Sequence, residues 1–206
     1  MNPANERPTG RPRTIDPDRV SLIALRLFDE RGFDDVSMDD VAAAAEVSRR
    51  SLFRLFPSKA ALVWGGLDES ADRFRASLAG SAPDDDLWDV IRTAYAAAVD
   101  LPAEMLEVTR HRLHVIQANP ALAVVGASTI GAMTDAAVRF ASERDASPSD
   151  ALQTAVRAHA LAGASSAALF WWALHGGDES PVAVVRRAFA LVSFDETRPS
   201  DSGGPA

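Results

Sequence analysis

Apolar residues recur along most of the chain at the spacing of amphipathic helices, and the first such stripe is the clearest. It lies between residues 16 and 31 and consists of Val20, Ile23, Ala24, Leu27 and Phe28. These positions follow i, i+3, i+4, i+7 and i+8, so they share one helix face. Asp16 is a good N-cap, Pro17 suits the first turn and Gly32 is a typical stop. The pattern predicts a helix over residues 16–31.

Several further helices are predicted, the first of them short. Ser37 caps a second helix, and a turn at residues 46–48 leads to a third, which Pro57 ends. Ser58 caps a fourth helix that runs to about residue 80. Others are expected to begin near residues 84, 102, 120, 149 and 181, and no alternating strand pattern is visible. The fold class is therefore all-α, with about nine helices.

The composition is that of an ordinary globular protein, with 206 residues of which 47% are hydrophobic. The chain has no cysteine, which excludes disulfides and thiolate metal sites. It shows no apolar run of about 18 uncharged residues and no N-terminal signal core, so we expect a cytoplasmic protein without a membrane segment. Residues 1–14 are expected to form a disordered basic arm, and residues 197–206 a disordered tail.

Charge is unevenly distributed along the chain. Residues 1–60 hold ten Lys/Arg and ten Asp/Glu, whereas residues 61–206 hold eleven and nineteen, which gives the whole chain its net charge of -8. Within this acidic protein, the run V-S-R-R-S-L-F-R-L-F-P-S-K at 47–59 has four cations and no acid. The run is either a solvated helix face or a surface that meets phosphate.

Two short helices joined by a tight turn, with the second one basic, have the layout of a helix-turn-helix. The second helix would enter the major groove of DNA, where arginine reads guanine or binds phosphate. A hydroxyl at the start of the first of these helices suits a phosphate. The candidate DNA-binding residues are Ser37, Ser48, Arg49, Arg50, Ser51, Phe53, Arg54 and Lys59.

The stretch A-A-A-A-E-V-S-R-R-S-L-F-R-L-F-P-S-K at 42–59 resembles the signature of the TetR family of transcriptional regulators. The resemblance is specific over residues 15–66. It implies a homodimer with a three-helix DNA-binding domain, here 15–60, and a helical ligand-binding and dimerisation domain, here 61–196. Family habit implies a repressor of a palindromic DNA operator that a small-molecule effector releases.

Two positions depart from the family pattern. Glu46 stands where the turn usually has glycine, and a left-handed non-glycine residue costs roughly 1 kcal/mol. Phe53 stands where a tyrosine usually reaches a phosphate, so one hydrogen bond is missing. Phe53 then packs either on the sugar-phosphate backbone or in the protein core.

Three segments are also similar to the regulators associated with mycofactocin gene clusters. They are the basic run R-R-S-L-F-R-L-F-P-S-K, the following V-W-G-G-L-D, and R-H-R-L-H-V-I-Q-A-N-P-A-L from residue 110. This similarity implies long-chain acyl-CoA as the effector.

Large side chains of the later helices are candidates for the walls of an effector pocket. The candidate ligand-binding residues are Trp88, Tyr95, Met105, Arg110, Phe140 and Trp171, although ordinary core is the more common role for any one large apolar side chain. The cluster Arg110, His111, Arg112 and His114 could meet an anionic head group or pair with nearby acids such as Glu104 and Glu107. No cofactor and no metal site is expected, because a third ligand for a histidine pair is lacking.

Small residues near position 165 are predicted to allow close helix contact between two subunits. The candidate dimer-interface residues are Gly163, Ala164, Ala167, Phe170, Val185 and Phe189, on the last two predicted helices. Earlier in the chain, Gly65 and Gly66 interrupt the fourth predicted helix, where they are either a flexure point or a site of close packing.

An enzyme is the main competing class, but the sequence lacks a nucleophile elbow, a P-loop, a dinucleotide-binding fingerprint and an H-E-x-x-H motif. We therefore expect no catalytic residues. The other alternative is a ligand-binding or scaffold protein that has lost DNA binding. The intact basic run at 47–59 argues against this alternative.

Overall fold

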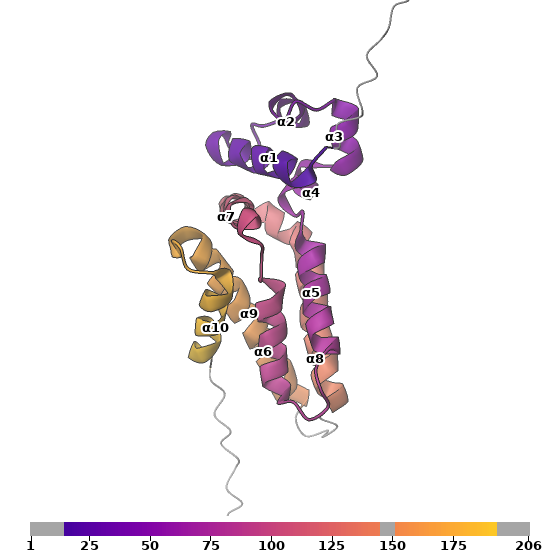
Figure 1. Cartoon of the computed structure of the whole chain (residues 1–206), viewed down its shortest axis with the longest axis vertical. Coiled ribbons are helices and arrows are strands. Elements are labelled where there is room, and N and C mark those ends of the chain that lie inside the picture. The colour runs from indigo at the N-terminus through magenta and orange to yellow at the C-terminus, as the bar shows by residue number, and fades with distance from the viewer. Residues whose placement is uncertain (1–14, 145–150, 193–206) are drawn as a thin grey trace, which may run out of the picture.

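The structure is a computed structural model that describes residues 15–144 and 151–192, and within these ranges every regular element is an α-helix (Figure 1). The predicted arm at 1–14 and tail at 197–206 lie outside the described residues. The helices are α1 (Pro17–Arg31), α2 (Met38–Ala44), α3 (Arg49–Leu55), α4 (Lys59–Val63), α5 (Leu67–Ala79), α6 (Leu87–Ala98), α7 (Ala103–Ala118), α8 (Pro120–Arg144), α9 (Ala151–His175) and α10 (Pro181–Leu191).

Helices α1 and α4 begin at the side-chain caps that the sequence predicted. The Asp16 carboxylate accepts hydrogen bonds from the backbone N–H groups of Asp18 and Arg19. The Ser58 hydroxyl accepts the N–H of Ala61 at 3.1 Å. Each cap satisfies an N–H group that has no partner inside the helix.

The predicted fourth helix is two helices, which explains why the described residues hold ten helices instead of about nine. The first part, α4, ends at Val63 with Trp64 as its C-cap, and Gly66 adopts a left-handed backbone with φ 84° before α5 starts at Leu67. A side chain at Gly66 would be strained in this conformation, so glycine is required there. The Gly65-Gly66 pair therefore forms a defined corner in the chain.

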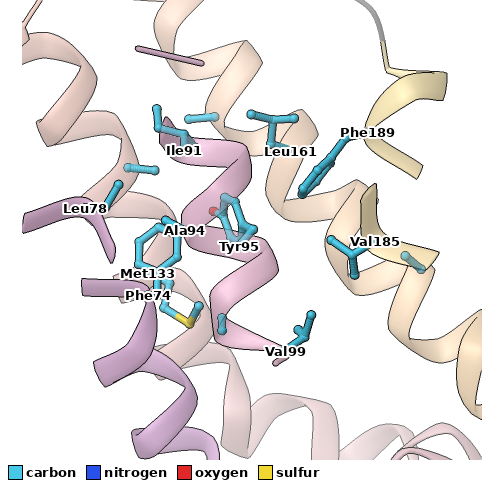
Figure 2. Packing of buried hydrophobic residues seen from close by; sticks show 14 of the residues in the cluster. Phe74, Leu78, Ile91, Ala94, Tyr95, Val99, Met133, Leu161, Val185 and Phe189 are labelled. Atoms are coloured by element: carbon cyan, nitrogen blue, oxygen red, sulfur yellow. The ribbon is translucent and has the colours of Figure 1, made fainter. Parts of the chain in front are cut away.

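The buried residues form two clusters, at opposite ends of the molecule. The larger one joins α5, α6, α8, α9 and α10, and Figure 2 shows Phe74, Tyr95 and Phe189 meeting inside it. The smaller one lies among α1–α4 and is completed by Val108, Val115 and Ile116 of α7 and by Leu122 of α8. Because α7 supplies part of the N-terminal core, α7 lies packed against this end of the molecule (Figure 1).

Among the described residues, α8 is the helix that has the length and apolar composition to cross a membrane by those criteria alone. It packs against α5 and α9, and buried Gly126 lies under the ring of Trp64. These contacts account for part of its apolar character. The remaining exposed apolar side chains on α8 are Val124, Val125 and Ile130.

Candidate nucleic-acid interface and ligand site

The turn between α2 and α3 keeps a tight left-handed geometry although it lacks glycine. Glu46 has φ 56°, and the neighbouring Val47 N–H donates to the Ala42 carbonyl at 3.0 Å. A left-handed non-glycine residue costs about 1–2 kcal/mol, so Glu46 carries strain that the flanking helices maintain. The turn was expected to differ slightly because Glu46 replaces glycine, but Glu46 still adopts the left-handed conformation.

Leu52 is fully buried, and α3 therefore has a fixed inner face and presents its polar face to solvent. On that face Arg50 and Arg54 are exposed and have no ion pair among the described residues. Arg49 is also exposed, but it pairs with Asp39 at 3.0 Å and lies over the Phe53 ring. The α3 surface thus offers two free guanidinium groups and one that is already engaged.

The Phe53 ring is 38% exposed and lies on the polar face of α3. The interpretation of Phe53 as a core residue is therefore wrong. Its exposed ring can pack on the sugar-phosphate backbone of a bound duplex, beside Arg49.

The serines predicted to contact DNA cap the starts of α2 and α3. Ser48 and Ser51 are joined by their hydroxyls at 2.9 Å, and Ser48 also accepts the Ser51 N–H, at the start of α3. Ser37 forms a reciprocal capping box with Asp40 at the start of α2. Hydrogen bonds from the Ser37 side chain and backbone lower the pKa of the Asp40 carboxyl, which keeps it ionised. The ionised Asp40 and the reciprocal cap already occupy the N–H groups of Ser37 and Asp40 at the start of α2, so these groups are not available to a phosphate.

Lys59 is not a free cation. Its Nζ donates to the Phe33 carbonyl at 2.6 Å and to the Asp34 carbonyl at 3.4 Å, and it lies 4.5 Å from the centre of the Phe33 ring. Lys59 therefore ties the start of α4 to the loop between α1 and α2. This contact corrects the expectation of an open phosphate ligand at this position.

A cavity of about 360 Å³ lies between the corner at Gly65-Gly66 and the helices α6, α7, α8 and α9. Its walls are mainly apolar and include Leu101, Met105, Leu113, Ile116, Met133 and Phe170. A volume at the lower end of the range for small-molecule pockets, with apolar walls, suits an apolar or amphipathic ligand. Tyr95 also lines the cavity, and burial raises the pKa of its phenol, so the group is neutral.

Of the predicted ligand-binding residues, only Tyr95 and Met105 line this cavity. The others are occupied elsewhere. Trp88 and Phe140 are covered by the guanidinium groups of Arg157 and Arg144. Trp171 is exposed on α9 and stacks with His175, while Arg110 donates to the carbonyls of Trp172 and Gly177. None of these four residues lines the cavity, because each makes its contacts with other groups.

The basic residues 110, 111, 112 and 114 of α7 make different kinds of contact. His111 Nδ1 lies 3.1 Å from Asp29 and its Nε2 lies 3.8 Å from Glu107, which agrees with the acid-pairing alternative for this residue. His114 contacts the Ala173 carbonyl. Arg112 alone of the four lines the cavity, which agrees with the head-group alternative for this one member of the cluster. Trp64, which follows the last residue of α4, also lines the cavity and was not predicted from the sequence pattern.

The predicted dimer residues fall into two groups. Val185 is 0% and Phe189 5% exposed, and both lie in the protomer core (Figure 2), so they are not available to a second subunit. Phe170 lines the cavity, and Ala164 is packed against the core. Gly163 and Ala167 are exposed on α9. They belong to an outward apolar stripe that consists of Leu152, Val156, Gly163, Ala167, Trp171 and Leu174.

Comparison with known proteins identifies two family models on this chain. The model described as "Bacterial regulatory proteins, tetR family" matches residues 23–63, and "MftR C-terminal domain" matches residues 85–195. A Mycobacterium tuberculosis protein named as a mycofactocin biosynthesis transcriptional regulator, MftR, is 35% identical over 118 residues. That alignment covers 57% of this chain and 60% of the relative, so less than two thirds of the relative is matched.

Solved structures of regulators share the fold. A TetR-like transcriptional regulator from Rhodococcus sp. RHA1 has a TM-score of 0.56 at 23% identity, covering 88% of this chain and 96% of that one. Thermus thermophilus FadR, a transcriptional repressor in complex with lauroyl-CoA, has a TM-score of 0.56 at 19% identity, covering 93% of this chain and 100% of that one. At these identities the likeness concerns the fold alone.

Proposed function

The chain belongs to the TetR family of bacterial regulatory proteins, with a C-terminal domain of the MftR type, and from this premise we propose that it is a dimeric repressor that an amphipathic effector releases from a palindromic operator. The observation that carries the proposal is the outer face of α3, where Arg50 and Arg54 are exposed beside Phe53. A family of regulatory proteins also agrees with the expectation that the chain is not an enzyme. The protein would act in the cytoplasm, where its DNA lies.

The cavity supports an effector with a long apolar part. Its walls are mostly aliphatic and aromatic, and it touches both α7 and the corner that joins α4 to α5. The Thermus FadR with a similar fold binds lauroyl-CoA, an acyl chain with an anionic head. We therefore propose a long-chain acyl-CoA as the effector class for this chain.

The test is a binding titration of the purified protein with DNA from upstream of its own gene, at two salt concentrations, with and without a long-chain acyl-CoA. Tight binding that weakens steeply with salt, and weakens again with acyl-CoA, is the expected result. Salt-sensitive binding that ignores acyl-CoA would contradict the effector and keep the regulator. If upstream DNA is not bound, selection from random DNA follows, and failure there would contradict the regulator.

The outward stripe on α9 is the proposed dimer surface, because it is mainly apolar over about six turns, interrupted by His159, and its side chains are exposed in the protomer. Gly163→Arg is expected to raise the dimer dissociation constant by about a hundredfold or more, because each subunit would bury an unpaired charge. The position has open space for a side chain, so the protomer should fold normally. Sedimentation velocity measures the shift to monomer.

The matched control for the dimer surface is Ala76→Arg, which adds the same charge to an exposed position of α5. This variant is expected to remain dimeric. If Gly163→Arg is as dimeric as the control at equal concentration, the subunits meet at another face.

A further inference from the structure

Arg112 lies where the cavity meets the corner between α4 and α5. It projects from α7, and its Nε donates to the carbonyl of Val63, the last residue of α4, at 2.6 Å. Its two terminal nitrogens lie 3.7 and 3.5 Å from where side chains would begin at Gly65 and Gly66. The guanidinium group therefore touches the end of α4, the corner and the cavity at once.

The charge of Arg112 is only partly compensated. Burial lowers the pKa of Arg112 to about 10, a shift that the attraction of Asp18 and Glu69 partly offsets, so the group is charged at neutral pH. Neither carboxylate is within ion-pair distance, and the ion pairs among the described residues do not include Arg112. A desolvated guanidinium without a close carboxylate is a strong binding site for an oxyanion.

The other charged groups of the cavity do not provide an equivalent site. Arg73 also lines it, but its Nε and one terminal nitrogen already donate to the Ala97 and Ala98 carbonyls and to Ser70, so it offers fewer free donors than Arg112. Asp18 and Glu69 are exposed, so water already hydrates their charges. An anionic ligand would therefore be recognised through Arg112.

We propose that Arg112 binds the anionic group of the effector, a carboxylate or phosphate, and that this interaction loosens the end of α4. The inference rests on the proposed function and adds the residue that senses the effector. An oxyanion in the cavity competes directly with the Val63 carbonyl of α4 for the guanidinium, whose charge the Asp18 carboxylate of α1 also attracts from a longer distance. Because α4 belongs to the N-terminal core, loss of its bond to Arg112 weakens the connection between that core and α7.

The first measurement compares decanoate with 1-decanol, which share a chain and differ in head-group charge, by calorimetry without DNA. Wild-type protein is expected to bind decanoate at least about tenfold more tightly, as a charge-assisted hydrogen bond implies. Arg112→Gln is expected to bring the two affinities together by weakening decanoate alone. Equal affinities in the wild type, failure to bind either molecule, or an unchanged preference in Arg112→Gln would each overturn the site.

A second variant tests the same competition while Arg112 is kept. Asp18→Asn removes a competing carboxylate, so it is expected to strengthen decanoate binding severalfold and to leave decanol binding unchanged. Asp72→Asn removes an exposed carboxylate of α5 that pairs with Arg75, and no change is expected. If Asp18→Asn behaves like Asp72→Asn, Asp18 does not compete for the guanidinium.

The effect on α4 is measured by amide hydrogen exchange over residues 59–67, also without DNA. Decanoate is expected to speed exchange there in the wild type at least severalfold, whereas decanol should not, and Arg112→Gln should show no response to decanoate. Binding without faster exchange would overturn the loosening of α4. Because no step uses DNA, these results are separate from whether the protein proves to be a repressor.

Discussion

Replacing Arg50 and Arg54 together by alanine is expected to reduce operator affinity by about 2–6 kcal/mol, roughly thirtyfold or more. Both side chains are exposed on α3 and have no ion pair among the described residues, so their donors are available to bases or phosphates. Leu52 holds the helix from its inner face and is untouched by the change, so the fold should be kept. Fluorescence anisotropy with a labelled operator fragment measures the weaker binding.

Two single variants show whether the loss of affinity is specific to the α3 surface. Arg49→Ala is expected to cost less, because Arg49 must give up its pair with Asp39 before it meets DNA. Arg75→Ala removes an exposed, ion-paired arginine of α5 and should leave affinity unchanged. Removing each arginine that binds a phosphate should also reduce the salt slope by about one. Wild-type affinity and slope in the double variant would mean that α3 does not face DNA.

The helix-turn-helix could be predicted in detail because its determinants are local. The helix bounds depend on capping serines, on Pro57 and on the apolar spacing of α1. Each of these acts within a few residues, and the structure places the helices accordingly. Lys59 shows the limit of this reasoning. Its charge is visible in the sequence, but the carbonyls of Phe33 and Asp34 that bind it come from a loop about 25 residues earlier.

The ligand site was predicted less well, for a physical reason. Periodicity shows which residues share a helix face, but it does not show which neighbouring helix that face meets. Arg110 and Arg112 are two residues apart on α7 and therefore point to different sides, one to the carbonyls of Trp172 and Gly177 and the other to the cavity. Phe189 similarly has the pattern of an interface residue and lies in the protomer core.

Gly126→Ala is expected to destabilise the protein by about 1–3 kcal/mol, the usual cost of overpacking a core, and to weaken operator binding as well. A methyl group at Gly126 would lie only 2.3 Å from Cη2 of Trp64. The indole is also held by its Nε1, which donates to the Leu122 carbonyl at 2.9 Å, so the ring cannot shift freely. Because Trp64 is the C-cap of α4, its displacement would move the helix that follows the helix-turn-helix.

Gly131→Ala is the matched control, since it makes the same change in the same helix at a position with open space. It should stabilise the protein by up to about 1 kcal/mol, because alanine favours helix more than glycine does. Trp64→Leu in the Gly126→Ala background removes the clashing ring, so the double variant should lose less stability than the two single changes added together. Thermal unfolding measures stability and anisotropy measures operator affinity. If Gly126→Ala is stabilised as much as Gly131→Ala, the ring moves without cost. If Gly126→Ala also keeps wild-type operator affinity, the contact between α8 and α4 does not govern DNA binding.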